Sequence, residues 1–245
     1  MKRILVLLSL ACAVFSLSAQ TLERVTPESV GMDAQRLSNA DAAIEQAIQK
    51  KNIPGAVLAV VRHGKMAYIK AYGNKRVDPK NEPMTIETVF DMASCSKAMS
   101  TAVCTMTLIE QGKIRLQDRV SDYIPGYEGW TDEKGNKTAI RIIDLLTHTS
   151  CLPAYADANM LKEKYGAPNR DGLIDYIAHC KRNFKPGTDM TYSCLNFITL
   201  QRIIETVSGD DLRTYAHKHV FDVLGMKNTD YNPSKEMAKR CAPTE

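Results

Sequence analysis

Four consecutive residues, Ser94-Cys95-Ser96-Lys97, place a serine and a lysine three positions apart. On a helix such residues share a face, with Cβ atoms about 5–6 Å apart, so the serine hydroxyl can contact the lysine amine. A serine hydroxyl becomes a useful nucleophile when a base takes its proton, and a lysine serves as that base when its surroundings lower its pKa. The spacing indicates a candidate nucleophile, Ser94, beside a candidate base, Lys97. The same letters also fit a capping serine and a solvated lysine.

Tyr192 is another residue that could move a proton. It follows the turn Pro186-Gly187 and precedes an apolar run that begins at Leu195. A tyrosine with a lowered pKa can share a proton with a serine and a lysine and pass it to a leaving group. Taken alone, Tyr192 is more typical of a half-buried structural tyrosine, so its candidacy depends on the residues around it.

The element that must present Ser94 is a predicted helix over residues 94–112. Its apolar residues recur at helical spacing: Met99, Val103, Met106 and Ile109. Gly112 is a suitable residue to end the helix. A serine at a helix N-terminus is favoured further as a nucleophile, because free backbone N–H groups there stabilise the negative charge that develops during its reaction.

The segment before Ser94 predicts a helix and a β-hairpin. Asp33 is expected to cap a helix that ends around Lys51. Two runs rich in Val, Ile and Tyr, residues 56–62 and 66–71, are joined by the short turn 63–65.

The segment after Ser94 is predicted to be mostly helical, with helices over residues 140–146, 173–181, 195–207 and 212–223. A two-stranded hairpin is not stable alone, and no further strand-rich run precedes Glu245. Either helices cover the hairpin, or the strands that complete its sheet lie beyond the end of the sequence. The second interpretation is favoured, so residues 20–245 are interpreted as a single incomplete domain.

The first nineteen residues are interpreted as a signal peptide. Lys2 and Arg3 precede an apolar run over residues 4–15, and small residues follow. Cleavage is expected near Ala19, and a lipoprotein signal using Cys12 is the alternative. The mature protein is therefore expected to be exported to the periplasm or secreted.

The composition narrows the classes of molecule that the protein could bind. The 32 basic and 28 acidic side chains give a net charge of +4, which is too small and too dispersed to argue for nucleic acid. No run of 18 apolar residues follows the N-terminus, so no stable membrane span is expected. The oligomeric state is not specified by the sequence.

Six motifs occur in one order along residues 27–226: Ile53-Pro54-Gly55-Ala56, Ala71-Tyr72-Gly73, Phe90-x-x-Ala93-Ser94-x-Ser96-Lys97, Gly112-Lys113-Ile114-x-Leu116-x-Asp118-x-Val120, Leu145-Leu146-Thr147-His148-Thr149-Ser150, and Pro186-Gly187-Thr188-x-x-x-Tyr192-Ser193, followed by Leu224-Gly225-Met226. In this order they resemble the class C β-lactamase-like serine hydrolases. That family includes penicillin-binding DD-peptidases, class C β-lactamases and related esterases.

The resemblance implies a mixed α/β (α+β) fold of the β-lactamase/DD-peptidase type, with an antiparallel sheet flanked by helices and a large helical region. It implies that Ser94 is the acylated nucleophile, Lys97 its base partner, and Tyr192 the base and proton relay. Which residue acts as base in S-x-x-K enzymes is disputed. The expected substrate is a small molecule or peptide (an ester, a D-amino peptide or a β-lactam), and no cofactor or metal is expected.

Three departures from the family pattern stand out. Cys194 occupies the position where the family has Asn or Asp, and this is the residue expected to contact substrate. Cys151 replaces a glycine, which costs backbone freedom if that position needs a positive φ. The family's late Lys-Thr-Gly or His-x-Gly motif, on a strand that supplies an oxyanion N–H group, is absent. Activity of the 245-residue form is therefore expected to be poor.

The cysteines allow further hypotheses. By the resemblance, Cys95, Cys151 and Cys194 line the site, so an exported protein could form a disulfide between Cys151 and Cys194. Three tolerated free thiols are the simpler alternative, and a metal site that joins these thiols to His148 is a third. A protein that keeps the fold but only binds peptidoglycan or a partner is the alternative function. Cys151 and Cys194 favour it, whereas the intact set of Ser94, Lys97 and Tyr192 opposes it.

Overall fold

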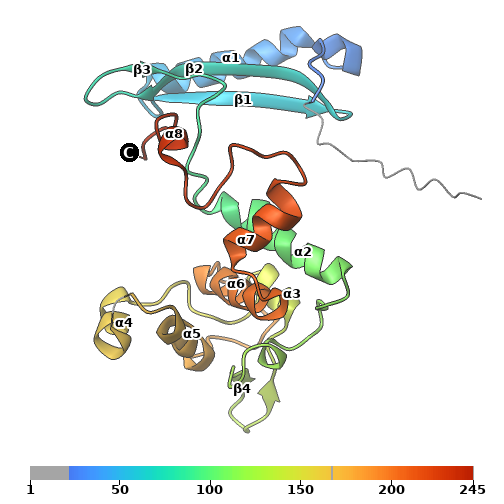
Figure 1. The fold of residues 1–245 in the computed structure, drawn as a ribbon, viewed down its shortest axis with the longest axis vertical. Helices are drawn as coiled ribbons and strands as arrows, with labels where there is room; N and C mark the ends of the chain where they lie inside the picture. Colours follow the sequence, from blue (N-terminus) through green and yellow to red (C-terminus); the bar gives the residue numbers. More distant parts are fainter. Residues whose placement is uncertain (1–21, 167, 245) are drawn as a thin grey trace, which may run out of the picture.

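The computed structural model describes residues 22–166 and 168–244. The predicted signal peptide, residues 1–19, lies outside the described residues. A small antiparallel sheet with one long helix occupies one end of the molecule, and a larger helical region occupies the other (Figure 1). The chain that carries Ser94 runs from the sheet into the helical region. The predicted mixed α/β fold with an antiparallel sheet is confirmed.

The sheet consists of a hairpin and one short strand. β1 (Gly55–Arg62) pairs antiparallel with β2 (Lys65–Arg76), which also pairs with β3 (Glu82–Pro83). The predicted hairpin is confirmed, although its turn is only His63-Gly64 and β2 continues beyond the expected end at residue 71. β3 escaped prediction because it is two residues long and ends in a proline, which is depleted in strands.

Helix α1 (Ala34–Gln49) packs against β2. Asp33 caps it as predicted, accepting a hydrogen bond from the Arg36 N–H at 3.1 Å. Side chains at positions 68, 70 and 72 of a strand share one face, and here all three reach the Asp41 carboxylate on α1. Hydrogen bonds from the Tyr68 and Tyr72 hydroxyls, followed by the Lys70 ammonium, lower the pKa of Asp41 to about 2. This polar cluster joins the helix to the sheet.

The predicted helix over residues 94–112 is confirmed, but its beginning is irregular. A π-helical segment, η2 (Lys97–Ala102), leads into α2 (Val103–Glu110). Gly112 lies just beyond the helix end with a positive φ of 69°, as the sequence predicted. The π-helical turns were not predicted, because apolar spacing cannot distinguish a short wider helix from an α-helix.

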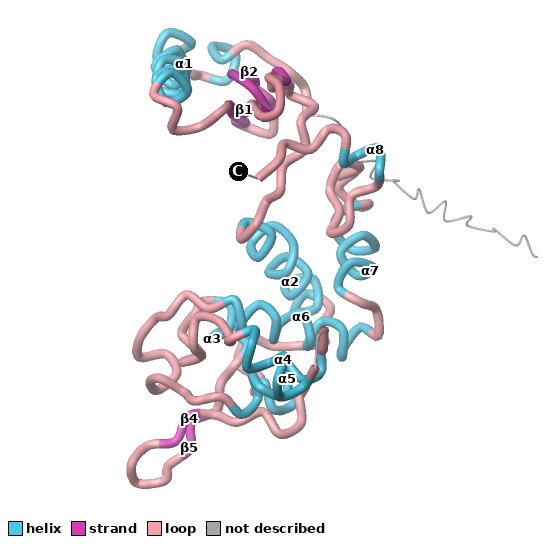
Figure 2. The backbone as a smooth tube through the Cα atoms, turned by 90° about the vertical axis from the view of Figure 1, so that its left-hand side faces the viewer, coloured by secondary structure: helices cyan, strands magenta, loops and turns pink. Residues whose placement is uncertain are grey.

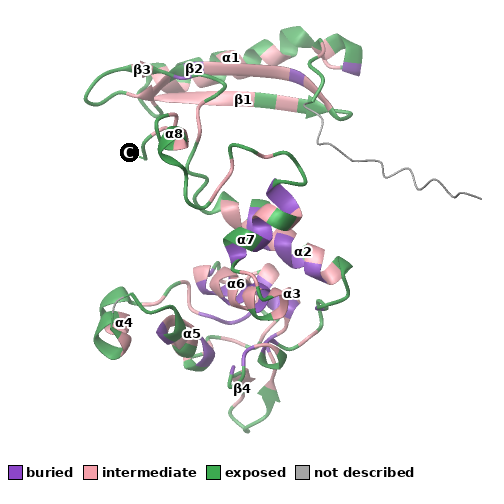
Figure 3. Cartoon of the chain, in the orientation of Figure 1, coloured by how far each residue is buried: buried purple, intermediate pink, exposed green. Residues whose placement is uncertain are grey.

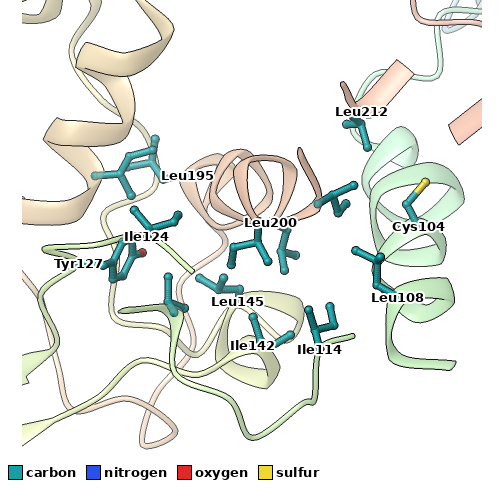
Figure 4. Close-up of a cluster of buried hydrophobic side chains, with 14 of the residues drawn as sticks. Cys104, Leu108, Ile114, Ile124, Tyr127, Ile142, Leu145, Leu195, Leu200 and Leu212 are labelled. Carbon is teal, nitrogen blue, oxygen red and sulfur yellow. The ribbon is translucent and has the colours of Figure 1, made fainter. Parts of the chain in front are cut away.

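The hydrophobic core lies in the helical region around α6 (Cys194–Ser208), as the concentration of buried residues there shows (Figure 3). α6 contacts α2, α3 (Ile142–Leu146), α5 (Arg170–His179) and α7 (Leu212–Ala216). Side chains from these helices and their connecting loops meet along it (Figure 4). Full burial of one such aliphatic side chain contributes roughly 1.5–3 kcal/mol. α6 is therefore the central packing element of this region.

Several short elements complete the described chain. The structure contains η1 (Pro27–Val30), η3 (Val120–Asp122), β4 (Trp130–Thr131), β5 (Lys137–Thr138), α4 (Ala158–Tyr165), η4 (His217–Phe221) and α8 (Lys235–Ala238). β4 and β5 form a separate two-stranded sheet, and α4 and α8 have no buried residue. Elements this short or this exposed leave little apolar pattern in the sequence, which explains why α4, α8, β4 and β5 were not predicted. No helix in the described part of the chain is long and apolar enough to cross a membrane.

Residues near position 241 return to the segment just before Ser94. Val89 forms a parallel bridge with Cys241, and the Ala242 N–H donates to the Val89 carbonyl at 2.8 Å. The sequence predicted only coil here. The tube view shows this return passing between the sheet and the helical region (Figure 2).

Arg182 binds several backbone carbonyl oxygens at the end of α5, and we call this arrangement the Arg182 clamp. Its guanidinium donates to the carbonyl oxygens of Glu128, Ile177, Ala178 and Cys180 at 2.7–3.1 Å. The guanidinium also lies over a buried aromatic ring, 5.2 Å from its centroid. One side chain thus satisfies carbonyls at the end of a helix and in a separate loop.

Arg182→Lys should lower the free energy of unfolding by about 2–4 kcal/mol, because an ammonium cannot reproduce the planar fork and leaves carbonyl oxygens unpaired. Urea denaturation at neutral pH measures the effect. The matched control Arg115→Lys changes an exposed arginine and should stay within about 0.5 kcal/mol of wild type. Equal unfolding midpoints for the two variants would contradict the clamp.

Candidate active site

Ser94 lies at the entrance to the helix that η2 and α2 form. Its carbonyl accepts a hydrogen bond from the Lys97 N–H at 3.1 Å, and the preceding Ala93 has a φ of 41°. A left-handed φ at a residue with a Cβ is uncommon and costs about 1 kcal/mol or more. Hydrogen bonds to Ala93 hold this turn: its N–H donates to Asp91 Oδ1 at 2.8 Å, and its carbonyl accepts from Ser96 Oγ at 2.6 Å. The turn leaves Ser94 exposed at the helix start.

The Lys97 Nζ lies 3.0 Å from Ser94 Oγ, within hydrogen-bonding distance. The three-residue spacing therefore brings the two groups together as the sequence predicted. Among the hydrogen bonds of the described residues, the Ser94 N–H has no acceptor.

Tyr192 completes the cluster from a distant part of the chain. The Lys97 Nζ lies 5.3 Å from the centre of its ring. Interaction with the Ser94 side chain and then with Lys97 lowers the pKa of Tyr192 below its ordinary value. About half of the tyrosine side chain is exposed (49%), so the cluster opens to solvent.

Lys97 remains an ammonium in this setting. Burial alone would lower its pKa, but hydrogen bonding to Tyr192 and interaction with Cys194 outweigh burial and raise it. The charge favours the phenolate form of Tyr192, since an opposite charge nearby stabilises an ionised group. The electrostatics thus make Tyr192, and not Lys97, the stronger candidate base.

The loop that carries Tyr192 is held by residues that the sequence did not predict to position it. The His148 carbonyl accepts from the Thr191 N–H at 3.0 Å, and His148 Nδ1 accepts from the Ser193 N–H at 3.1 Å. Asn196 Nδ2 also contacts this nitrogen, at 3.0 Å. The sequence contained only a weak signal for this role, namely the position of His148 within a family motif.

Cys151 and Cys194 are both free thiols, so the disulfide considered between them is not formed. The two residues lie in different surroundings. Cys151 is buried in the hydrophobic core, whereas Cys194 at the start of α6 interacts with Lys97. Cys151 also has a φ of 65°, which confirms that the position occupied by glycine in the family pattern needs a positive φ.

The other cysteines considered from the sequence lie near Ser94 and Lys97. Cys194 lies beside the cluster, and its proposed contact with substrate stays a prediction. Cys95 is exposed next to Ser94. No group of three or more His, Cys, Asp or Glu side chains that could hold a metal ion occurs in the described ranges, so the alternative metal site at His148 is not formed.

A cavity of about 600 Å³ borders the cluster through Ala93 and Ser96. It is lined mainly by residues 86–93 and 226–241 and does not include Ser94, Lys97 or Tyr192. The three candidate catalytic groups therefore lie on an open surface beside this cavity and not inside it.

Comparison with known proteins assigns this architecture to a protein family. An antiparallel sheet carrying one long helix, next to a helical region that begins at an S-x-x-K turn, defines a fold of the β-lactamase type. The family model described as Beta-lactamase matches residues 40–245, and the chain belongs to that family.

Relatives and solved structures agree on the fold. An N-acetylmuramyl-L-alanine amidase from Bacillus subtilis (strain 168) is 32% identical over 235 residues, covering 90% of this chain and 52% of the relative. A putative D-alanyl-D-alanine carboxypeptidase from Salmonella typhimurium is 29% identical over 93% of this chain and 55% of its own. The hydrolase EstCE1, with promiscuous acyltransferase activity, superposes with a TM-score of 0.73 at 27% identity, covering 88% and 56% of the two chains. A class C β-lactamase gives a TM-score of 0.71 at 26% identity, covering 86% and 56%. This chain thus spans about half the length of the relatives it matches.

Thiol labelling of the native, unreduced protein should modify Cys95 readily and leave Cys104 and Cys151 unmodified until the protein is unfolded. Burial raises the pKa of Cys104 to about 11 and that of Cys151 to about 12, and the thiolate is the reactive form. Maleimide labelling followed by peptide mass analysis measures each site. A peptide pair linked through Cys151 and Cys194 would contradict the free thiols.

Proposed function

We propose that this protein is an exported serine hydrolase in which Ser94 forms an acyl-enzyme with the carbonyl of an ester, a D-amino peptide or a β-lactam. The observation that carries the proposal is the 3.0 Å contact between Ser94 Oγ and Lys97 Nζ, with the Tyr192 ring centre 5.3 Å from the same ammonium. Members of the family are serine hydrolases, which supports the reaction class. Export rests on the basic, apolar and small residues of positions 1–19.

Acylation begins with Tyr192 as the base. As Ser94 Oγ attacks the carbonyl carbon, its proton passes to the Tyr192 oxygen, and the Lys97 ammonium stabilises the negative charge that both oxygens share. The tyrosine then delivers this proton to the leaving group when the carbonyl–leaving-group bond breaks. The acyl group remains on Ser94.

Deacylation uses the same relay in reverse. A water molecule loses a proton to Tyr192 as it attacks the acyl ester, and the proton returns to Ser94 Oγ when the acid leaves. The Ser94 N–H, which has no acceptor among the hydrogen bonds of the described residues, is proposed to donate to the developing oxyanion. Since this group is a single donor, a second donor from elsewhere in a longer chain would raise the rate, and one such donor is worth about a hundred- to a thousandfold.

Substrate class is the finer part of the proposal. The relatives carry the names amidase and carboxypeptidase, and one solved structure is described as a hydrolase with acyltransferase activity. All three names describe transfer of an acyl group from its leaving group to an acceptor, which is the chemistry that Ser94 can initiate. Cys194, beside Lys97, is proposed to contact the substrate in the position where the family has an amide or carboxylate side chain.

The first test measures the mass of the intact protein after incubation with a fluorophosphonate and, separately, with a penicillin. A single adduct on Ser94 is expected, and it should be lost in Ser94→Ala. Ser38→Ala is the matched control, because Ser38 is an exposed serine of α1 whose Oγ donates to a backbone carbonyl three residues earlier. The 245-residue chain and a form continued to the length of its relatives are compared, with faster labelling expected in the longer form. If a folded longer form shows no adduct, the proposed enzymatic function is overturned and the alternative function as a binding protein is favoured.

The second test is the pH dependence of acylation. The rate should rise with pH as Tyr192 loses its proton, with a midpoint below the ordinary tyrosine value of about 10. Lys97→Met removes the positive charge that lowers this pKa, so the midpoint should move to higher pH and the rate at pH 7 should fall at least about a hundredfold. Lys97→Arg keeps the positive charge, so its midpoint should shift less than that of Lys97→Met. An unchanged midpoint in Lys97→Met would rule out Tyr192 as the base.

A further inference from the structure

His148 has an unusual backbone. Its φ is 61°, in the left-handed region that side chains with a Cβ rarely adopt. Residues held in this region tend to occur where the surrounding structure needs them for function. The contacts of His148 identify what is held.

Three consecutive residues of the candidate-base loop are bound by this one histidine. Its carbonyl accepts from the Thr191 N–H at 3.0 Å, and its ring nitrogen Nδ1 accepts from the Ser193 N–H at 3.1 Å. Between these two contacts, the imidazole packs on the Tyr192 ring with centroids 4.5 Å apart and an angle of 39° between the planes. His148 therefore fixes the backbone on both sides of Tyr192 and one face of its ring.

A buried chain of hydrogen bonds determines which nitrogen of the imidazole carries the proton. Ser150 Oγ donates to Asn196 Oδ1, which orients the amide so that its Nδ2 donates to His148 Nδ1. The Ser193 N–H, which can only donate, points to the same nitrogen. Ser150, Ser193 and Asn196 are each no more than 1% exposed. Nδ1 therefore faces two donors and must be an acceptor, which leaves the ring neutral with its proton on Nε2.

The charges around the ring favour the same state. Burial and then the Lys97 ammonium lower the pKa of His148. From α6 the ring meets Phe197, with centroids 5.3 Å apart, and from the loop it meets the Tyr192 phenol. The nearest acid along the chain, Asp144 in α3, directs its carboxylate to the Arg141 N–H and the Thr149 hydroxyl.

We propose that His148 is a positioning residue, whose neutral, Nε2-protonated ring holds the Tyr192 phenol beside Ser94 and Lys97. The proposal rests on the proposed function, in which Tyr192 moves the proton of Ser94. Protonation of Nδ1 would replace an acceptor by a donor that faces the Ser193 N–H, and the loop would lose its anchor.

The tautomer can be measured without any activity. Nitrogen-15 NMR of the histidine rings, with His148 assigned by its absence in His148→Asn, should find Nδ1 unprotonated and Nε2 protonated. The ring should stay neutral to a pH below the ordinary histidine value of about 6.5. An Nδ1–H tautomer, or a pKa at or above the ordinary value, would overturn the proposal.

The ionisation of Tyr192 provides a second readout that is independent of turnover. In wild type its pKa, followed by NMR of carbon-13-labelled tyrosine and assigned with Tyr192→Phe, should lie below 10. His148→Ala should let it rise to the ordinary range, because the hydroxyl loses its place beside Lys97. His148→Asn should keep it low, since asparagine tolerates a left-handed φ and its Oδ1 replaces the Nδ1 acceptor. A low Tyr192 pKa in a folded His148→Ala variant would refute the positioning role.

Kinetics then connect the geometry to the reaction. His148→Ala should slow fluorophosphonate labelling of Ser94 by about 10- to 100-fold, the range that loss of alignment by about 1 Å can produce. His148→Asn should remain within about fivefold of wild type. His63→Ala is the matched control, because His63 is also a left-handed histidine (φ 52°) but lies exposed in the β1–β2 turn, and its rate should equal that of wild type.

A double-mutant cycle separates positioning from general stability. In a Tyr192→Phe background, His148→Ala should change the residual labelling rate by less than about twofold, because the group it positions is gone. Additive losses would assign His148 a structural role only. If wild type itself does not label at Ser94, the proposed function fails, and the two NMR measurements still decide whether His148 positions the Tyr192 hydroxyl.

Discussion

Burial of α6 is the constraint on which the rest of the structure depends. Leu195, Leu200 and Ile203 are almost completely buried, and the helices that surround α6 pack on it. Because Tyr192 lies two residues before α6 and Ser94 lies just before the helix that α6 contacts, one packed interface determines the distance between them. The polar groups of the cluster contribute little to that placement, since they lie on an exposed surface where hydrogen bonds compete with water. The hydrophobic core of the helical region therefore sets the geometry of the proposed chemistry.

Much of the fold was predictable because its signals are local. The cap at Asp33, the Val, Ile and Tyr residues of the hairpin strands and the glycine after the Ser94 helix each follow from a preference of one or a few neighbouring residues. The pair Ser94 and Lys97 was predictable for the same reason, since one helical turn joins them. Tyr192 could be assigned only through the order of family motifs, because nothing local brings a residue from the second half of the chain to Ser94.

The features that sequence did not predict depend on contacts between distant segments or on the direction of a side chain. The bridge from Val89 to Cys241 pairs two single residues, and no pattern in either segment signals it. The disulfide considered between Cys151 and Cys194 is not formed, because two cysteines in family motifs need not lie together, and Cys151 is buried in the core. His148 occupies a family motif, yet its proposed role depends on an acceptor nitrogen that faces two donors, which only the three-dimensional arrangement reveals.

The half-exposed position of Tyr192 has a consequence for how the medium affects the site. Coulombic attraction between an ammonium and a phenolate at a solvent-exposed surface is screened by mobile ions, whose screening length falls from about 10 Å at 0.1 M to about 3 Å at 1 M ionic strength. The advantage that Lys97 gives to the phenolate therefore shrinks as salt rises, while the hydrogen bonds that place the hydroxyl persist. The strength of the proposed base therefore depends on the ionic strength of the surroundings as well as on the fold.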